Sequence, residues 1–375
     1  MGLEIGIAVV KALIVVLIVL HLTVFLLWVE RKGSALIQNR IGANRAAIFG
    51  VLPWNTGIVT TLMADPVKMF TKEDFVPQGA DRLLHWLAPF LSVFPILITF
   101  ACIPFGDELR IGDTRISLQV ADLNVGVLYV LAVVSLGVYG IVLAGWASNN
   151  RWALLGGLRG SAQMISYELA MGLSLVSVVM AFGTLDLQTM VRAQGVGLGT
   201  FLGFGRPVLD WIPAWGICYQ PLAFLIFFAA GIAESKRIPF DLPESESELI
   251  NGYYTEYSGG KQATFMFSDF AEIVLVSGLV TTFFFGGWQI PFVGRGGFEF
   301  PWGGTLALPH LLIVPAQVIA FLAKVFFFCW FQILIRWTLP RFRYDQLMRL
   351  GWKMLLPLAL VNVVITAAMI LIGQS

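Results

Sequence analysis

The sequence predicts an all-α protein that crosses a membrane with about eight helices. Hydrophobic residues make up 58% of its 375 residues, charged residues make up only 13%, and the mean hydropathy is +0.81. A soluble domain carries about 25% charged residues, so this chain has too few to cover a surface in water. Uncharged stretches of about 20 residues, enough to span the hydrocarbon as a helix, also recur along it. We therefore expect one integral membrane domain over residues 1–375.

Eight segments have the length and apolarity of membrane-spanning helices. They comprise residues 5–29, 86–105, 124–147, 161–183, 211–233, 266–286, 309–336 and 354–372. The first segment ends in charged residues and has no small-residue cleavage site, so we expect an uncleaved anchor rather than a signal peptide. Residues 53–70 mix apolar side chains with Asp65 and Lys68, which is typical of an amphipathic helix lying on the membrane surface.

Lysine and arginine are distributed unevenly between the predicted loops. One set of loops holds seventeen of them and the other set holds five. Cytoplasmic loops of membrane proteins are enriched in these residues. The bias therefore predicts that the first set is cytoplasmic, including the loop 30–85 and the loop 234–264, and that both termini lie on the opposite side.

Several ionisable residues fall inside the predicted spans or at their ends. They are Lys11, Glu168, Glu234, Asp269, Glu272 and Lys324. A charge at bilayer depth is costly, so such a residue is a functional hypothesis by default. For Glu168, Glu272 and Lys324 we favour a role in proton handling or in a polar network over an inert internal ion pair. Lys11 is expected to extend to the interface, and Asp269 is expected to lie at the interface before its span.

The loop 234–264 concentrates acidic residues where the charge bias predicts basic ones. Six carboxylates lie within 23 residues: Glu234, Asp241, Glu244, Glu246, Glu248 and Glu256. A solvated acidic loop is the usual explanation of such a run. Here proline, phenylalanine, leucine and tyrosine are interspersed, and the loop joins two spans directly. These features favour a partly buried acidic funnel that opens to the cytoplasmic side.

The residues that bind metals and redox cofactors are scattered. Three cysteines and three histidines lie far apart along the chain, which argues against a disulfide framework, a metal site, a haem clamp or an iron–sulfur cluster. No phosphate loop or nucleophile-and-base grouping is apparent, and a net charge of +1 provides no field to attract nucleic acid. If redox chemistry takes place, its electrons must arrive from another subunit.

Short motifs with charged or polar residues occur in one order from about residue 29 to residue 353. In the first half they are Val29-Glu30-Arg31-Lys32, Gln38-Asn39-Arg40-Ile41-Gly42, Leu62-Met63-Ala64-Asp65-Pro66-Val67-Lys68, Gly145-Trp146-Ala147-Ser148-Asn149, Leu155-Gly156-Gly157-Leu158-Arg159, Ala162-Gln163 and Ser166-Tyr167-Glu168. In the second half they are Ala233-Glu234 with Arg237, Pro239-Phe240-Asp241-Leu242, the alternating Glu244, Glu246 and Glu248, Thr255-Glu256-Tyr257-Ser258-Gly259, Ala271-Glu272, and Pro340-Arg341-Phe342-Arg343-Tyr344-Asp345-Gln346-Leu347-Met348. With these motifs the chain resembles the H-subunit family of bacterial proton-pumping NADH:quinone oxidoreductase, respiratory complex I.

The resemblance implies a membrane protein of the bacterial inner membrane that docks the peripheral arm and builds most of a quinone tunnel. Quinone would be the substrate, FMN and iron–sulfur clusters would reside in partner subunits, and the partners would be peripheral-arm quinone-site subunits and small and antiporter-like membrane subunits. The residues that the motifs assign to the tunnel are Arg31, Gln38, Arg40, Asp65 and Lys68. Those assigned to an acidic proton channel are Glu168, Glu234, Arg237, Asp241, Glu244, Glu246, Glu248, Glu256 and Glu272. Arg341, Arg343 and Asp345 would lie at a subunit interface.

Two positions depart from the pattern of that family. Gly42-Ala43-Asn44 stands where the family usually has Gly-Pro-Asn, and without the proline the turn near Arg40 is less firmly set. Tyr254 replaces the usual histidine, which argues against an imidazole that titrates there.

Two other functions remain as alternatives. A homologous membrane subunit of a membrane-bound NiFe hydrogenase would share the acidic motifs without a quinone tunnel, but the intact stretches 29–45 and 62–68 favour the quinone enzyme. A stand-alone transporter often shows internal repeats, and no convincing repeat is present here.

Overall fold

The computed structural model describes residues 2–42, 64–112, 114–201, 211–244, 249–294, 296–299 and 304–374. Its first half contains α1 (Gly2–Ile37), α3 (Asp65–Thr71), α4 (Arg82–Thr99), η2 (Phe100–Cys102), β1 (Glu108–Ile111), β2 (Thr114–Ser117), α5 (Gly126–Val134), α6 (Gly137–Ala147) and α7 (Arg151–Phe182). The second half contains α8 (Leu187–Ala193), α9 (Leu198–Phe201), α10 (Gly216–Tyr219), α11 (Pro221–Glu234), η4 (Gly252–Tyr254), α13 (Gly259–Phe284), β3 (Val293–Gly294), β4 (Gly297–Glu299), β5 (Thr305–Ala307), α14 (His310–Thr338), α15 (Tyr344–Arg349), η5 (Leu350–Leu355) and α16 (Leu356–Gln374).

The structure confirms the all-α, multi-pass prediction. Within the described part of the chain, seven helical stretches are long and apolar enough to cross a membrane. The fifth predicted span, 211–233, corresponds to the shorter helix α11, which has 14 residues and follows the single turn of α10. The third predicted span is divided into α5 and α6 at Ser135, whose hydroxyl donates to the carbonyl of Leu131 at 2.7 Å and competes with the helical ladder there.

Helix α7 begins at Arg151, ten residues before the predicted start of its span. The Asn150 side chain accepts a hydrogen bond from the backbone N–H of Trp152 at 2.9 Å and so satisfies a free donor of the first turn. Gly183 ends the helix with φ of 68°, a left-handed conformation that glycine adopts without steric cost. Hydropathy missed the first turns because Arg151 and Arg159 lower it.

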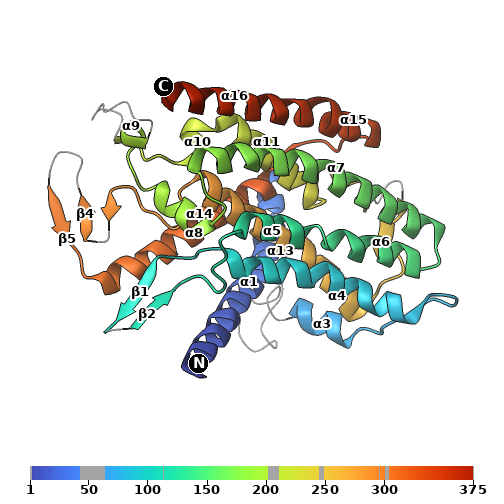
Figure 1. Ribbon diagram of the computed structural model, residues 1–375. Helices are drawn as coiled ribbons and strands as arrows, with labels where there is room; N and C mark the ends of the chain where they lie inside the picture. Colours follow the sequence, from blue (N-terminus) through green and yellow to red (C-terminus); the bar gives the residue numbers. More distant parts are fainter. Residues whose placement is uncertain are drawn as a thin grey trace.

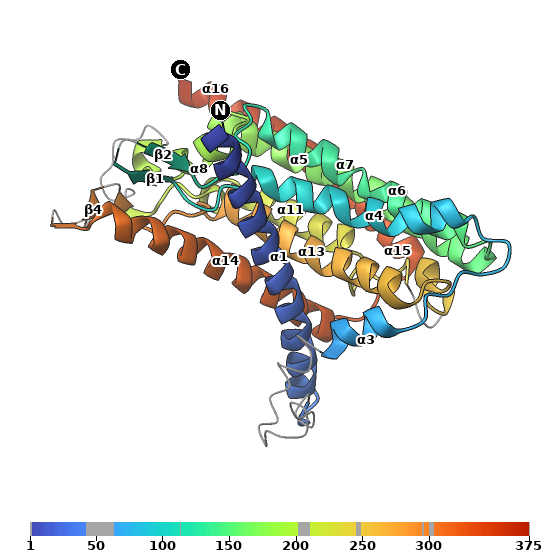
Figure 2. The same ribbon diagram turned by 90° about the horizontal axis from the view of Figure 1, so that it is seen from below.

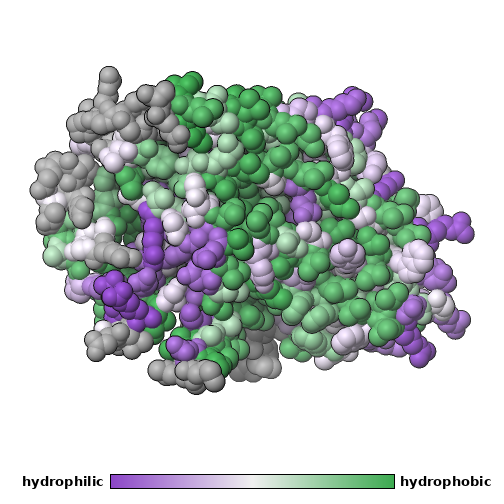
Figure 3. All heavy atoms as spheres, viewed as in Figure 1, coloured by the Kyte–Doolittle hydropathy of each residue, from purple (hydrophilic) through white to green (hydrophobic). Residues whose placement is uncertain are grey.

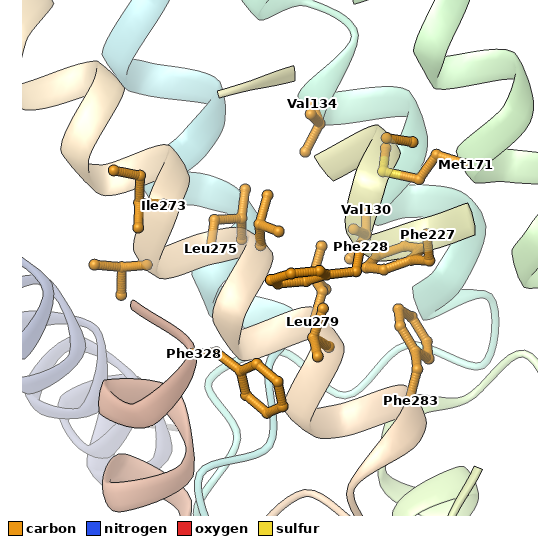
Figure 4. Packing of buried hydrophobic residues seen from close by; sticks show 14 of the residues in the cluster. Val130, Val134, Met171, Phe227, Phe228, Ile273, Leu275, Leu279, Phe283 and Phe328 are labelled. Atoms are coloured by element: carbon orange, nitrogen blue, oxygen red, sulfur yellow. The ribbon is translucent and has the colours of Figure 1, made fainter. Parts of the chain in front are cut away.

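The long helices lie side by side, and α13 runs through their centre (Figures 1 and 2). In its most apolar window 78% of the residues are buried, against 22% for the first and for the last span. Figure 4 shows side chains of α5, α7, α11, α13 and α14 pointing toward one another around it, among them Val130, Met171, Phe227, Leu279 and Phe328. Figure 2 shows α1 crossing the other helices obliquely, with its C-terminal end extending beyond them.

The outer faces of the peripheral helices are apolar. Large exposed side chains include Ile5, Val9 and Leu13 on α1, and Val364 and Leu371 on α16. Figure 3 shows hydrophobic residues over the middle of the molecule and hydrophilic residues gathered mainly toward two ends. Such an arrangement suits a protein whose middle contacts lipid rather than water.

The two sets of loops lie at opposite ends of the bundle. The β1–β2 hairpin and the antiparallel sheet β3-β4-β5 lie toward the end that holds α8 and α9 (Figure 1). Helix α3 lies at the other end and contacts the start of α13. The same end therefore holds the loop between α11 and α13, which joins the residues of the candidate site.

Candidate functional site

Ten charged side chains gather where the loop after α11 folds back against α1, α13 and α14. We call them the charged cluster: Glu30, Glu234, Lys236, Arg237, Asp241, Glu244, Asp269, Glu272, Arg336 and Arg341. Burying so many charges is costly unless they are paired or protonated. The described members comprise six carboxylates and four cations, so pairing alone cannot neutralise them.

The loop after α11 is held in place by a neutral side chain of α7. The Gln163 amide donates to the carbonyls of Ala233 at 2.6 Å and of Phe240 at 2.8 Å. These hydrogen bonds fix both ends of the segment 233–240, which carries Lys236 and Arg237. The segment is also fixed from the far side, because the backbone N–H of Phe342 donates to the carbonyl of Pro239 at 3.0 Å.

Lys236 is the centre of one branch of the cluster. Its side chain is 2% exposed, and its Nζ lies 3.0 Å from Asp269 Oδ1 and 3.2 Å from Glu272 Oε2. The Tyr254 hydroxyl donates a hydrogen bond to Asp269. Asp269 and Glu272 are three residues apart on α13 and so share a helix face, which allows one ammonium to reach both.

Three arginines form the second branch. Arg341 Nη2 lies 2.8 Å from Asp241 Oδ2, and Arg336 Nη1 lies 2.7 Å from Glu30 Oε1. The Arg237 guanidinium lies 4.1 Å from the centre of the Phe270 ring, where a cation is attracted by the ring face. This branch joins the end of α1 to the end of α14.

Glu244 interacts with charged groups of both branches. Burial, followed by the charges of Asp269 and Asp241, raises the pKa of Glu244 to about 8, although Arg237 and Arg336 oppose the shift. Burial also raises the pKa of Asp241, against the attraction of Arg341. Carboxylates that interact this closely titrate as a set.

Glu234 extends the cluster into the bundle. Its side chain is buried, and both Glu272 and the partly exposed Glu168 lie within electrostatic range of it. A cavity of about 10 Å³ is lined by Glu234 and Glu272 and by apolar residues of α5, α7, α11 and α13, several of which appear in Figure 4. That volume is close to the minimum for one water molecule.

The residues assigned to a quinone tunnel lie beside this cluster, at the end of α1. Arg31 Nη1 lies 2.6 Å from Asp65 Oδ2 on α3, so the structure brings these two together. Arg40 Nε donates to Gln38 Oε1 at 2.6 Å, and Lys68 is exposed on α3. Of the predicted amphipathic segment 53–70, residues 53–63 lie outside the described residues.

An apolar crevice of about 160 Å³ opens between α1 and α14 near these residues. Its lining consists of Trp28, Val29, Lys32, Gly33, Leu36, Ile37, Trp330, Ile333, Leu334 and Trp337. The crevice combines apolar walls with a single cation, Lys32. Such a lining suits a ligand with an apolar chain.

Other predicted residues lie apart from the charged cluster. The Glu256 carboxylate accepts from the Asn150 amide at 2.7 Å, beside the start of α7. Arg343 and Asp345 are exposed and pair with each other at 3.1 Å, whereas Arg341 belongs to the cluster. Glu246 and Glu248 lie outside the described residues.

Four cluster members are not among the site residues that the sequence predicts: Glu30, Lys236, Asp269 and Arg336. Glu30 and Arg336 stand at the ends of predicted spans and Lys236 stands in a predicted loop, where charges are ordinary. Asp269, expected at the interface, is 2% exposed inside the bundle. The available signal was its spacing of three residues from Glu272, because two carboxylates on one buried helix face need either a cation nearby or a bound proton.

Lys324 belongs to a different network at the opposite end. Its Nζ donates to the carbonyls of Phe285 at 2.8 Å, Gly287 at 3.0 Å and Gln289 at 2.7 Å, and it lies 4.6 Å from the centre of the Trp215 ring. A cation at the C-terminal end of a helix satisfies free carbonyls and complements the helix dipole. This network joins α14 to the end of α13.

The fold and site define a multi-pass helical membrane protein with buried ionisable groups at one end. The chain matches the family described as NADH dehydrogenase over residues 10–367. It is 44% identical to an NADH-quinone oxidoreductase H subunit of Cytophaga hutchinsonii, with 92% of this chain and 91% of that protein covered. It is 46% identical to an H subunit of Geobacter metallireducens, with 97% of each covered, and 41% identical to the H subunit of Bdellovibrio bacteriovorus, with 97% and 96% covered. The chain belongs to this H-subunit family of NADH-quinone oxidoreductase, as the motifs predicted.

Lys324→Met should lower the stability of the protein. It leaves three carbonyls without their donor, which costs about 1–3 kcal/mol. The measurement is the thermal midpoint of the purified assembly in detergent, with Lys353→Met, at an exposed position, as the control. A normal midpoint combined with a selective loss of proton translocation would instead support the proton-handling role predicted for Lys324.

Glu244 should make stability fall as the pH rises from about 4.5 to about 8. A carboxyl whose pKa is raised on folding contributes stability that is complete below its unfolded value of about 4.5 and is lost as the pH rises through about 8. Glu244→Gln should flatten this part of the plot of thermal midpoint against pH. Glu73→Gln, at an exposed position, should keep the original slope. An unchanged slope in Glu244→Gln would show that Glu244 does not carry the proton.

Proposed function

We propose that this chain is the membrane subunit of an NADH-quinone oxidoreductase that guides quinone to its electron donor and couples quinone reduction to proton translocation. Its relatives are named as the H subunit of that enzyme. The observation that carries the mechanism is the charged cluster, in which carboxylates outnumber cations inside an apolar bundle. FMN and iron–sulfur clusters would belong to partner subunits that dock on the end holding α3.

The excess of carboxylates supports storage of protons in the cluster. If all its described members were ionised, the cluster would carry two uncompensated negative charges, and desolvation opposes that state. Some carboxyls should therefore hold protons near neutral pH. Reduction of a quinone takes up two protons and changes the charge of the headgroup. A coupled set of carboxyls responds to such a change by redistributing its protons.

Two adjacent residues of α1 provide a direct link between the tunnel residues and the cluster. Arg31 pairs with Asp65, on the side assigned to quinone, while Glu30 pairs with Arg336 in the cluster. A charge that develops beside Arg31 would act on both ion pairs, because Glu30 and Arg31 are neighbours in the chain. The geometry thus supports electrical coupling without long-range motion.

The crevice between α1 and α14 supports entry of quinone from the lipid. Its walls are apolar, and its lining includes Val29 and Trp337, the chain neighbours of the paired Glu30 and Arg336. A quinone needs apolar walls for its tail and a few polar groups for its headgroup. In this arrangement the end with α3 faces the cytoplasm of a bacterial inner membrane, and both termini face the opposite side.

The hydrogenase alternative is tested by the proteins that purify together with the chain. Solubilisation in mild detergent should recover subunits that carry flavin and iron–sulfur centres. Recovery of a nickel–iron catalytic subunit in their place would overturn the quinone-reductase proposal.

Glu234→Gln and Glu272→Gln should each lower proton translocation and coupled quinone reduction by about tenfold or more, because a fixed neutral amide cannot exchange a proton. Both activities are measured in inverted membrane vesicles, with the amount of assembled complex determined in parallel. Asp122→Asn, at an exposed position in a loop at the opposite end, is the control. Normal proton translocation in both cluster variants would contradict the proposal that these residues form a proton path.

Gly33→Leu should raise the apparent KM for a long-tailed quinone several-fold. Gly33 lines the crevice, and a Cβ atom at this position would meet no atom within 4 Å, so a larger side chain there has space to begin in and would narrow the crevice. Gly6→Leu is a matched control, because it adds the same side chain to open space on α1 outside the crevice. A short-tailed quinone should be affected less. Equal KM values for the two variants would argue against entry through the crevice.

A further inference from the structure

Lys236 combines two features that are unfavourable taken separately. Its backbone has φ of 55°, in the left-handed region that glycine and asparagine adopt far more readily than lysine. Its ammonium is also buried, with the side chain 2% exposed. A residue chosen for the turn alone would be glycine or asparagine. Lysine at this position is therefore better explained by its charge than by the turn, and the function of that buried charge needs an explanation.

The two carboxylates that share the ammonium are held differently. Asp269 has a partner on each oxygen: Lys236 Nζ forms an ion pair with Oδ1, and the Tyr254 hydroxyl donates a hydrogen bond to Oδ2. Glu272 has Lys236 beside Oε2 and lines the small cavity opposite Glu234. Asp269 thus has a partner on each oxygen, whereas Glu272 also borders the cavity of about 10 Å³ that Glu234 lines.

We propose that Lys236 is a positioning residue of the proton path: its ammonium bridges Asp269 and Glu272 on α13 and balances the charge of Glu272, so that the Glu272 carboxylate alternately accepts a proton and releases it to Glu234. The step transfers one proton between two carboxylate oxygens across the cavity and needs no other reactant. This inference rests on the proposed coupling function and assigns a residue that the motifs did not mark.

The groups that face this unit come from several neighbouring elements. Asp269 and Glu272 belong to α13, Glu234 to α11, and Tyr253 and Tyr254 to η4. Glu168 of α7 also acts electrostatically on Glu234. Glu244 and Arg237 face it from the loop. The charge of Lys236 therefore has the most direct effect on the protonation of Glu272, because its Nζ contacts the Glu272 carboxylate.

Two variants change the positive charge available to Glu272 in opposite directions. Asp269→Asn leaves the whole ammonium to Glu272 and stabilises its anion, so the pH optimum of translocation should move down by about one unit or more. The double variant Lys236→Asn with Asp269→Asn removes the cation and its fixed partner together. Its optimum should move up, because Glu272 then lacks a cation. Asparagine suits the left-handed backbone at 236, and the paired change avoids an isolated buried charge.

The experiment measures proton translocation and quinone-reductase turnover against pH in vesicles that contain the assembled complex. Lys236→Arg, which keeps the charge, should preserve most of the wild-type profile. Opposite shifts in the other two variants support the proposal. Shifts in the same direction, or a double variant with the wild-type profile, would overturn it and leave Lys236 a purely structural ion-pair partner. If the double variant does not assemble, an unshifted optimum in Asp269→Asn is sufficient to overturn it.

Failure of the inference is separable from failure of the proposed function. If Glu234→Gln and Glu272→Gln lose translocation while the Lys236 and Asp269 variants keep the wild-type pH profile, only the inference about Lys236 is rejected. If the two glutamate variants also translocate protons normally, the proposed coupling function is rejected as well.

Discussion

Desolvation of carboxylates is the constraint on which the arrangement of this protein depends. Six acidic side chains and four basic ones converge at one end of an apolar bundle, and the bundle excludes the water that would otherwise stabilise them. Direct pairing neutralises part of this charge, and protonation is the remaining way to neutralise the rest. The same burial that makes the cluster costly makes it responsive, because a small change of field decides which carboxyl holds a proton.

Neutral side chains and helix ends keep that costly arrangement in place. Gln163 holds the loop after α11 by two backbone carbonyls, and α13 passes through the centre of the bundle with both of its ends fixed. At one end α13 contacts α3, and just beyond the other end the carbonyl of Phe285 accepts a hydrogen bond from Lys324. Five cluster members therefore lie on helices, and Gln163 holds the loop that carries four others.

Helix α1 gives the cluster a connection to its surroundings. It lies at the periphery, exposes apolar side chains on its outer face, and forms one wall of the apolar crevice. Its residues Glu30 and Arg31, near its C-terminal end, face different partners. A single helix thus carries an apolar outer face, one wall of the crevice and a residue of the charged cluster, and the proposed coupling of quinone to the cluster would need this combination.

The sequence by itself determined the membrane class, the spans, the family and most of the acidic residues of the site. Hydropathy and charge bias are local quantities, and motifs keep their order along the chain, so all of these can be read without a fold. Tertiary structure alone decided which charges meet. Glu30, Asp269 and Arg336 come from three helices, and Lys236 from a loop whose path depends on Gln163. Pairing of ions follows from distances in space between segments far apart in sequence, and hydropathy carries no information about those distances.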